Sequence, residues 1–345
     1  MGKTQSIRSR RKDEHIELAE KYYSVRRPSD FDQMHLIRPT LPESRVTDVD
    51  LTTTLFGHKL SAPLYINAMT GGSDKSKGIN AQLATIAAKL NIGMATGSAS
   101  ILVQEPAWSS SFTIVRENDP TGLVFTNINP NVTPAEANEI VDLLKADALQ
   151  IHVNAIQEAV MPEGDRDFVW LDKIAALAKK VKVPVIVKEV GFGFDQDSLE
   201  KLKEIGVKYV DVAGFGGTNF VDIENSRRKD FDMSYLSEIG LSAVKSLLAA
   251  KKVGITAFAS GGIRNPLDML KCLVLGGKAI GISGLVLHQL VDYGPEKAAD
   301  FVERLIGQLR LVLALYGLSK PYEAVRLKAY YNGDLKDFIK QQSLE

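Results

Sequence analysis

The feature that most constrains the fold is a repeated alternation between short apolar segments and longer segments with helical spacing, from residue 62 to residue 284. The apolar segments are rich in Val, Ile and Ala, and each is followed by an amphipathic stretch. Strands that alternate with helices in this way form parallel sheets covered by helices. We expect eight strands, at 62–70, 92–98, 122–129, the start of 148–158, 184–190, 209–214, 255–262 and 279–284.

Eight such units predict an α/β fold, a closed (β/α)₈ TIM barrel, in one domain. A doubly wound open sheet is the alternative, but no Gly-x-Gly-x-x-Gly turn follows the first expected strand. The length of 345 residues suits a barrel with additions at both ends. We assign residues 1–60 to an N-terminal extension, 62–295 to the barrel and 296–345 to extra C-terminal helices.

Composition narrows the classes of partner and location. The net charge is +0 and the pI is about 7, so no overall field attracts nucleic acid or an anionic membrane. No apolar run reaches the roughly 18 residues of a membrane span. Cys272 is the only cysteine, which excludes an intrachain disulfide and suits a reducing compartment. We therefore expect a cytoplasmic protein that binds a small molecule, and neither nucleic acid nor a membrane.

Polar and small residues gather where the expected strands end. In barrel enzymes the catalytic groups lie at the C-terminal ends of the strands. The ends here are rich in Gly, Ser, Thr and Asn, small residues that let the backbone approach a large flat ligand. The fourth end is the densest, with His152, Asn154, Gln157 and Glu158 within seven positions. A water-facing strand end would explain one such segment, but a whole ring of them favours a binding site.

The loops after the seventh and eighth strands have the composition of a phosphate site. They read Ser-Gly-Gly-Ile-Arg at 260–264 and Ile-Ser-Gly-Leu at 282–285, where this fold binds phosphate with loop amides and a helix N-terminus. Tight turns are the alternative explanation of these glycines. Lys188 lies inside an apolar run, so it has to be paired or neutralised. It either donates to a bound flavin ring or forms a Schiff base with a substrate.

Two further groups indicate an anionic ligand and a metal ion. Arg11, Lys12 and His15 lie on adjacent faces of an early helical turn, and their donors suit the oxygens of a diphosphate. A solvated basic arm is the alternative for this charge run. Glu158 is the metal candidate, because magnesium takes one or two carboxylates together with waters and phosphate oxygens. A surface glutamate is the alternative there.

Taken together, these motifs resemble those of one known family. They are Arg11-Lys12-Asp13-Glu14-His15, Ala68-Met69-Thr70-Gly71-Gly72, His152-Val153-Asn154 with Gln157-Glu158, Val187-Lys188-Glu189-Val190-Gly191 and Ser260-Gly261-Gly262-Ile263-Arg264. In this order the chain resembles the type 2 isopentenyl diphosphate isomerases, which are FMN-dependent (β/α)₈ enzymes. The resemblance covers nearly the whole chain. The basic N-terminal motif, combined with the Asn-x-x-Gln-Glu run, separates this family from other FMN barrels.

The resemblance implies interconversion of isopentenyl diphosphate and dimethylallyl diphosphate. It implies reduced FMN and Mg²⁺ as cofactors, NADPH as the reductant of the flavin, and a homotetramer or homo-octamer. The overall reaction is redox-neutral. We therefore hypothesise that the 5-nitrogen of the reduced flavin carries out the proton transfers, since protein acids protonate unactivated alkenes poorly, and that the protein supplies orientation and electrostatics.

The resemblance also implies a role for each matching residue. The N-terminal extension would bind substrate, and Glu158 would hold Mg²⁺. The catalytic residues would be Gln157 and His152, with Gln157 beside the allylic carbons. The substrate would be bound by Arg11, Lys12, His15, Ser98, His152, Asn154 and Gln157. FMN would be held by Ala68, Met69, Thr70, Ser98, Asn127, Lys188 and Thr218, with Gly261, Gly262, Ser283 and Gly284 at its phosphate.

Three other functions remain alternatives from the sequence. An FMN-dependent α-hydroxy-acid oxidase would need a histidine after the sixth strand, where this chain has Phe215, and phenylalanine cannot be a general base. A Schiff-base lyase would use Lys188, and a non-enzymatic flavin carrier would need neither the basic cluster nor Glu158. The long loop 215–235 contains Glu224, and it either closes the site, reaches a neighbouring subunit or is solvated.

Overall fold

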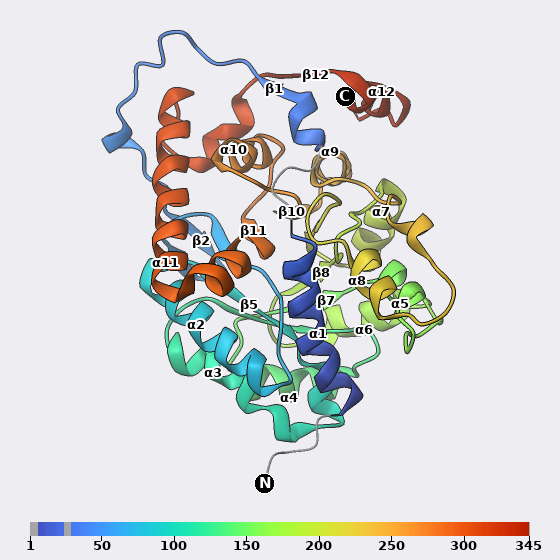
Figure 1. Ribbon diagram of the computed structural model, residues 1–345. Helices are drawn as coiled ribbons and strands as arrows, with labels where there is room; N and C mark the ends of the chain where they lie inside the picture. Colours follow the sequence, from blue (N-terminus) through green and yellow to red (C-terminus); the bar gives the residue numbers. More distant parts are fainter. Residues whose placement is uncertain (1–5, 24–28, 345) are drawn as a thin grey trace.

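Eight parallel strands close a barrel in the part of the chain that the structure describes (Figure 1). The structure is a computed structural model, and it describes residues 6–23 and 29–344, with only the backbone of Ile7 and Arg8. Around the barrel the strand order is β10-β11-β4-β5-β6-β7-β8-β9. The strands are β4 Leu64–Ile66, β5 Gly93–Ser98, β6 Val124–Ile128, β7 Ala148–His152, β8 Val185–Lys188, β9 Tyr209–Asp211, β10 Thr256–Ser260 and β11 Ile280–Ile282. The predicted fold class is confirmed.

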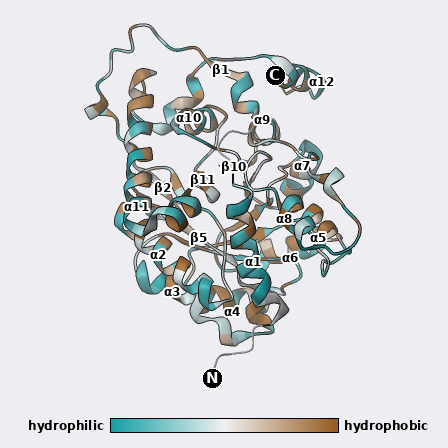
Figure 2. Cartoon of the chain, viewed as in Figure 1, coloured by the Kyte–Doolittle hydropathy of each residue, from teal (hydrophilic) through white to brown (hydrophobic). Residues whose placement is uncertain are grey.

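Helices between the strands cover the outside of the barrel. They are α2 Asp74–Leu90, α3 Ser110–Asn118, α4 Pro134–Leu144, α5 Ala155–Val160, α6 Leu171–Lys180, α7 Gln196–Glu204, α8 Phe220–Arg227, α9 Ala243–Val253, α10 Pro266–Val274 and α11 Gly284–Leu315. Apolar and polar residues alternate along the outer helices in Figure 2, as expected when one face packs on the strands. Helix α4 begins with a capping box between Thr133 and Glu136 and has Pro134 in its first turn, as its sequence predicts.

A short hairpin covers the N-terminal end of the barrel. Strands β2 Thr53–Leu55 and β3 His58–Leu60 are joined at Phe56 and Gly57, which both have positive φ. The Phe56 ring lies 5.1 Å from that of Tyr209 and 6.0 Å from that of Phe258, measured between ring centroids. Because these aromatic rings fill that end of the barrel, a ligand has to enter from the opposite end.

A segment of the N-terminal extension pairs with a C-terminal segment outside the barrel. Strand β1 Met34–Leu36 pairs antiparallel with β12 Ala329–Tyr331, which is followed by α12 Gly333–Gln341 (Figure 1). Helix α11 has a break at Gly294, where φ is 82° and Pro295 follows. This break lies next to the predicted boundary between the barrel and the C-terminal helices. Residues 1–5 and 24–28 of the N-terminal extension, and residue 345 at the C-terminus, lie outside the described residues.

Two segments differ from the sequence prediction. The segment 215–235, expected to be a loop, contains α8 and a 3₁₀ turn at Ser234–Leu236. The apolar residues of α8 do not line up on one face, so hydrophobic spacing does not reveal this helix. The helix expected between the strands at 209–214 and 255–262 begins only at Ala243, after an N-cap at Ser242 that accepts a hydrogen bond from the Lys245 amide.

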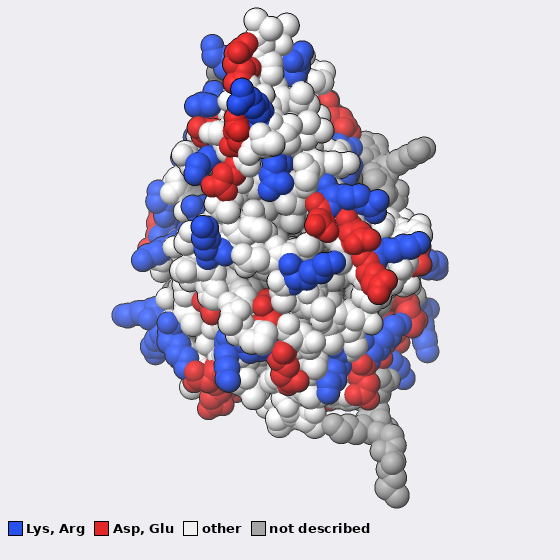
Figure 3. Space-filling model, turned by 90° about the vertical axis from the view of Figure 1, so that its left-hand side faces the viewer, with Lys and Arg blue, Asp and Glu red and all other residues white. Residues whose placement is uncertain are grey.

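Charged side chains of both signs are interspersed on the face of the described residues that Figure 3 shows. This mixture agrees with the net charge of +0. Among the described residues, no helix is both long enough and apolar enough to cross a membrane.

Candidate active site

A cavity of about 960 Å³ opens at the C-terminal ends of the barrel strands. It is large enough for a cofactor together with a small substrate. Almost all residues predicted to form the site line it: Arg11, Lys12, His15, Ala68, Met69, Ser98, Asn127, His152, Asn154, Gln157, Glu158, Lys188, Thr218, Gly261, Gly262, Ser283 and Gly284. Thr70 is the exception. It is 2% exposed, and its carbonyl accepts hydrogen bonds from the Gly97 amide and the Asn80 side chain behind the cavity wall.

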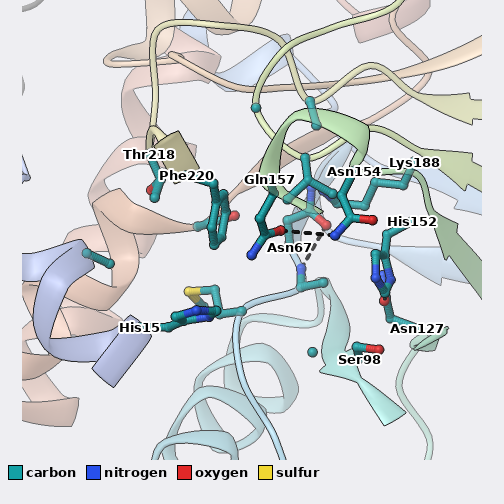
Figure 4. Close-up of a pocket in the computed structure, with 18 of the residues that line it drawn as sticks. His15, Asn67, Ser98, Asn127, His152, Asn154, Gln157, Lys188, Thr218 and Phe220 are labelled. Atoms are coloured by element: carbon teal, nitrogen blue, oxygen red, sulfur yellow. Dashed lines mark hydrogen bonds between the residues drawn. The ribbon is translucent and has the colours of Figure 1, made fainter. Parts of the chain in front are cut away.

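Helix α1 Ile7–Lys21 forms one wall of this cavity (Figure 4). It brings Arg11, Lys12 and His15 from the N-terminal extension opposite His152 and Asn127. Polar contacts hold the helix along its length to α2, α8 and α11: Ser73 with Asp13, Lys75 with Glu17, Arg227 with Glu14 and His288 with Glu20. The N-terminal extension therefore lines the cavity in which it is predicted to bind substrate.

The cations of α1 are half-buried and lie close to one another, with Glu163 and Glu224 beside them. Burial, followed in effect by the neighbouring Arg11, lowers the pKa of Lys12 to about 7, and Glu224 opposes the shift. Burial also lowers the pKa of His15, against the effect of Glu224. The Arg11 guanidinium approaches Glu163, with 3.3 Å between Nη1 and Oε1. An anion bound here would replace hydration that Lys12 lacks, so this end of the cavity suits a diphosphate.

These shifts predict pH-dependent anion binding. Bound diphosphate favours the charged form of Lys12. Binding of inorganic diphosphate should therefore be accompanied by uptake of a proton above about pH 7, and by little proton uptake below that pH. The affinity should then fall by up to roughly tenfold per pH unit above pH 7. Calorimetric titrations in buffers of different ionisation enthalpy measure the uptake. Lys12→Arg keeps its charge at these pH values, so it should lose this uptake. Equal proton uptake by both proteins would contradict the assignment to Lys12.

Neutral and acidic hydrogen-bonding groups follow strand β7. Asn154 Nδ2 donates to Gln157 Oε1 at 3.2 Å and to Glu158 Oε1 at 3.1 Å, and both contacts lie at the start of α5. Gln157 is 8% exposed, and its Nε2 donates to Glu224 Oε1 at 2.8 Å. Both ends of the Gln157 amide are therefore held, which fixes which atom faces which side.

Glu224 on α8 is a functional candidate that the sequence did not identify as such. It is fully buried and contacts Gln157, Arg227 and His15, whose Nε2 lies 2.9 Å from Oε1. Burial alone would raise its pKa, but hydrogen bonds from His15, Gln157 and Arg227 lower the pKa to about 2. Residues 216–220 and Ile223 of the segment 215–235 line the cavity, and the alternative of a solvated loop is wrong for the buried Glu224. A charged residue after Ile223 in an expected loop was the only signal in the sequence.

The glycine-rich side of the cavity fits a large planar ligand with a phosphate. Gly261 has φ of 93°, and a Cβ there would lie 2.0 Å from the Gly214 carbonyl oxygen, so a side chain is excluded. Helix α11 begins at Gly284, which places helix N-terminal amides at the cavity. Arg264 is paired with Asp32 and Asp268. At this end of the cavity, backbone amides are therefore more available to an anion than a free cation is. These features fit FMN.

The carboxylate of Glu158 faces the cavity but is not part of a preformed metal cluster. Its Oε2 accepts from the Asp165 amide at 2.8 Å. Among residues 6–23 and 29–344, the group with three close ligand atoms is Glu20, His288 and Asp292. A Mg²⁺ at Glu158 would therefore depend on waters and substrate phosphate oxygens, as this ion commonly does.

The oxidase and the Schiff-base lyase, two alternatives that each depended on a single residue, lose support. Phe215 does not line the cavity and packs against the apolar cluster of Val160, Phe192 and Val221. No proton-abstracting group is therefore available at this position. Lys188 is buried, and its Nζ donates to the Glu189 carbonyl at 2.8 Å in the cavity wall. This contact fixes the ammonium beside the glycine-rich wall, which fits a donor to a flavin ring.

Comparisons with known proteins identify relatives of this chain. A model of the FMN-dependent dehydrogenase family matches residues 113–327. The chain is 46% identical over 315 residues to an isopentenyl-diphosphate delta-isomerase of Latilactobacillus sakei, covering 91% of this chain and 90% of the relative. It is 44% identical over 340 residues to one of Staphylococcus aureus, covering 98% and 97%. A third, from Lacticaseibacillus paracasei, is 42% identical over 341 residues, covering 99% of both chains.

Solved structures with a similar fold include mandelate oxidases. One, with a C4a-OH-FMN adduct, has a TM-score of 0.62 at 15% identity and covers 92% of both chains. Another, with benzaldehyde, has a TM-score of 0.61 at 14% identity and covers 92% of this chain and 91% of the other. At this identity the likeness concerns the fold alone. Because it shares 42–46% identity with these relatives over nearly the full length of each chain, the chain belongs to the type 2 isopentenyl-diphosphate delta-isomerases, within the FMN-dependent dehydrogenase family.

Proposed function

We propose that this protein interconverts isopentenyl diphosphate and dimethylallyl diphosphate by a 1,3-allylic double-bond shift, in isoprenoid biosynthesis. One observation carries the proposal: a single cavity joins a glycine-lined wall suited to FMN to a cation-lined end closed by α1. Between them lies Gln157, an amide that does not ionise. The names of the relatives support the same activity.

The side chains of the cavity bind and orient the substrate in this proposal. Arg11, Lys12 and His15 attract the diphosphate, with Ser98, His152 and Asn154 on the opposite wall. Gln157 lies beside the allylic carbons, held by Asn154 and Glu224. Reduced FMN, when bound, supplies the acid and base for the allylic proton shift. Helix α1 and α8 exclude water by covering the cavity, which strengthens each of these electrostatic contacts.

The flavin is held by the opposite wall. The proposed FMN contacts are Ala68, Met69, Ser98, Asn127, Lys188 and Thr218, with Gly261, Gly262, Ser283 and Gly284 at the phosphate. Thr70 lies behind this wall, so its proposed contact would be through the neighbouring backbone. We further propose NADPH as the reductant, a cytoplasmic location and a homotetramer or homo-octamer, on the resemblance to the family.

The proposed metal site predicts that Glu158 affects the affinity for diphosphate when Mg²⁺ is present and has little effect without it. In Glu158→Gln, the Mg²⁺-dependent gain in affinity for diphosphate should fall by about 10- to 100-fold, because a neutral amide is a weaker magnesium ligand. Binding without Mg²⁺ should change little. Glu163→Gln is the matched control, since Glu163 also lines the cavity but pairs with Arg11 and Arg227. If both variants lose the same share of the Mg²⁺ effect, Glu158 is not the specific ligand.

An anaerobic assay tests the function itself. The purified protein is loaded with FMN, reduced with dithionite and incubated with isopentenyl diphosphate and Mg²⁺, and dimethylallyl diphosphate is followed. We expect product with reduced flavin and none with oxidised flavin. A protein that binds FMN but forms no product would overturn the proposal. Oxidation of a 2-hydroxy acid by the same preparation would favour the oxidase alternative.

A further inference from the structure

A row of buried amide side chains crosses the barrel, and Asn67 and Asn127 at its two ends line the cavity. The row connects Asp211 on β9, which is fully buried, with His152 on β7. Asn67 Nδ2 donates to Asp211 Oδ2 at 2.8 Å, and Gln150 Nε2 donates to Asn67 Oδ1 at 3.2 Å. Asn127 Nδ2 donates to Gln150 Oε1 at 3.2 Å, and Asn127 Oδ1 lies 2.7 Å from His152 Nδ1. We call Asn67, Gln150 and Asn127 the amide row.

The amide row has a fixed direction. The Ala68 backbone N–H donates to Asn67 Oδ1 at 2.7 Å, and a backbone amide can only donate. Asn67 therefore turns its Nδ2 to the Asp211 carboxylate, which can only accept when ionised. Each following amide donates its N–H to the acceptor before it and therefore turns its own oxygen to the next residue. The last atom of the row, Asn127 Oδ1, is consequently an acceptor that faces the His152 ring.

We propose that the amide row holds His152 as the Nδ1–H tautomer and leaves Nε2 as an unprotonated acceptor toward the cavity. Which ring nitrogen carries the proton is set by the hydrogen bond that the other side of the ring makes. The tautomer follows from these contacts alone, whereas its use toward a diphosphate rests on the proposed function. Asn67 and Gln150 are thus positioning residues that act on the ligand through His152.

The surroundings of the ring support a neutral histidine. Burial, with Lys12 of α1 and Lys188 of β8 next in effect, lowers the pKa of His152 to about 3. Arg11 acts in the same direction, and the nearby Ile128 carbonyl, which favours a protonated ring, opposes it. A neutral ring carries one N–H, and the 2.7 Å contact with Asn127 takes it. A diphosphate oxygen that reaches Nε2 must then bring the shared proton itself, because the ring has none to donate there.

Nitrogen-15 NMR of the flavin-loaded protein without substrate tests the tautomer directly. The chain has five histidines, so selective ¹⁵N-histidine labelling gives few signals, and His152→Gln identifies those of His152. We expect a protonated Nδ1 and an unprotonated Nε2, in about tenfold excess over the other tautomer, as one buried hydrogen bond would maintain. A predominant Nε2–H form would overturn the proposal.

Two variants distinguish an effect of the amide row on the tautomer from a general loss of stability in the core. Gln150→Met keeps much of the volume but interrupts the row, so the two tautomers should come within about twofold of each other. Tyr65→Phe is the control, because Tyr65 donates to Asp211 at 2.7 Å but is not part of the row, and the wild-type ratio should persist. The same ratio in Gln150→Met as in the wild type would contradict the proposal.

A third variant covers the case in which Gln150→Met does not fold. Asn127→Asp keeps an acceptor beside Nδ1, so the Nδ1–H form should persist while the added charge raises the pKa of His152. Loss of the Nδ1–H form in this variant would also overturn the proposal. These spectra need no turnover, so a protein with the expected tautomer but no isomerase activity would refute the proposed function and leave the amide row standing.

Discussion

Glu224→Gln should destabilise the protein by about 3 kcal/mol, near the lower end of the range for breaking a buried ion pair. Glu224 is fully buried and lies 2.6 Å from Arg227, between Oε2 and Nη1. The amide keeps the shape of the side chain but removes its charge. Arg227 retains Glu14 and Glu163, so the loss stays below that of a completely unpaired guanidinium. Urea unfolding of the flavin-loaded wild type and variant measures the difference in free energy of unfolding.

The pH dependence of this difference has a definite sign. The pKa of Glu224 is lowered from 4.5 to about 2 in the folded protein. A carboxyl group whose pKa is lowered by folding contributes its stabilisation above the unfolded pKa and loses it as the pH falls through the folded pKa. The difference between wild type and Glu224→Gln should therefore be constant from about pH 5 upwards and shrink between about pH 4.5 and 2.

Glu163→Gln serves as the control for this prediction. Glu163 contacts the same guanidinium at 2.8 Å, but its side chain is 30% exposed. A partly exposed ion pair contributes about 0–1 kcal/mol, so this variant should be nearly as stable as the wild type. Equal losses in the two variants would mean that burial of Glu224 does not determine its contribution.

The barrel could be predicted because its determinants are local in the sequence. The change between strand and helix spacing, the Thr133 cap and the polar ends of the strands all lie within a few residues of the elements they define. The residues expected in the site were therefore found together, because parallel strands bring their C-terminal ends to one side of a closed barrel. Thr70 was misplaced relative to the cavity because its strand ends four residues earlier, at Ile66.

The contacts that orient the site could not be predicted in the same way. Glu224 meets Gln157 across 67 positions, and Gln150 meets Asn67 across 83. Gln150 and Asp211 lie within apolar strands, where a single polar residue has no periodic signal that names its partner. The pairing of β1 with β12 also joins segments far apart in the sequence. Such partners depend on barrel register and loop closure, which a single sequence does not reveal.

Gln157→Leu should lower turnover of isopentenyl diphosphate by about 100- to 1,000-fold, the usual effect of removing one positioned hydrogen-bonding group from an active site. Leucine fills a similar volume but loses both the donor to Glu224 and the acceptor for Asn154. Diphosphate affinity should change little, because the charges of Arg11 and Lys12 on α1 are retained. The loss should therefore appear in kcat and leave KM nearly unchanged.

Gln104→Leu is the matched control for this prediction, because Gln104 borders the same cavity but is exposed. Its kcat should remain within about twofold of the wild type, as for most surface substitutions. The flavin absorption spectrum of both variants checks that FMN is still bound. If Gln157→Leu retains turnover, Gln157 has no part in the reaction. If it loses diphosphate affinity instead, the residue binds the anion and does not lie beside the carbons, and its hydrogen bond with buried Glu224 then serves the charged end of the cavity.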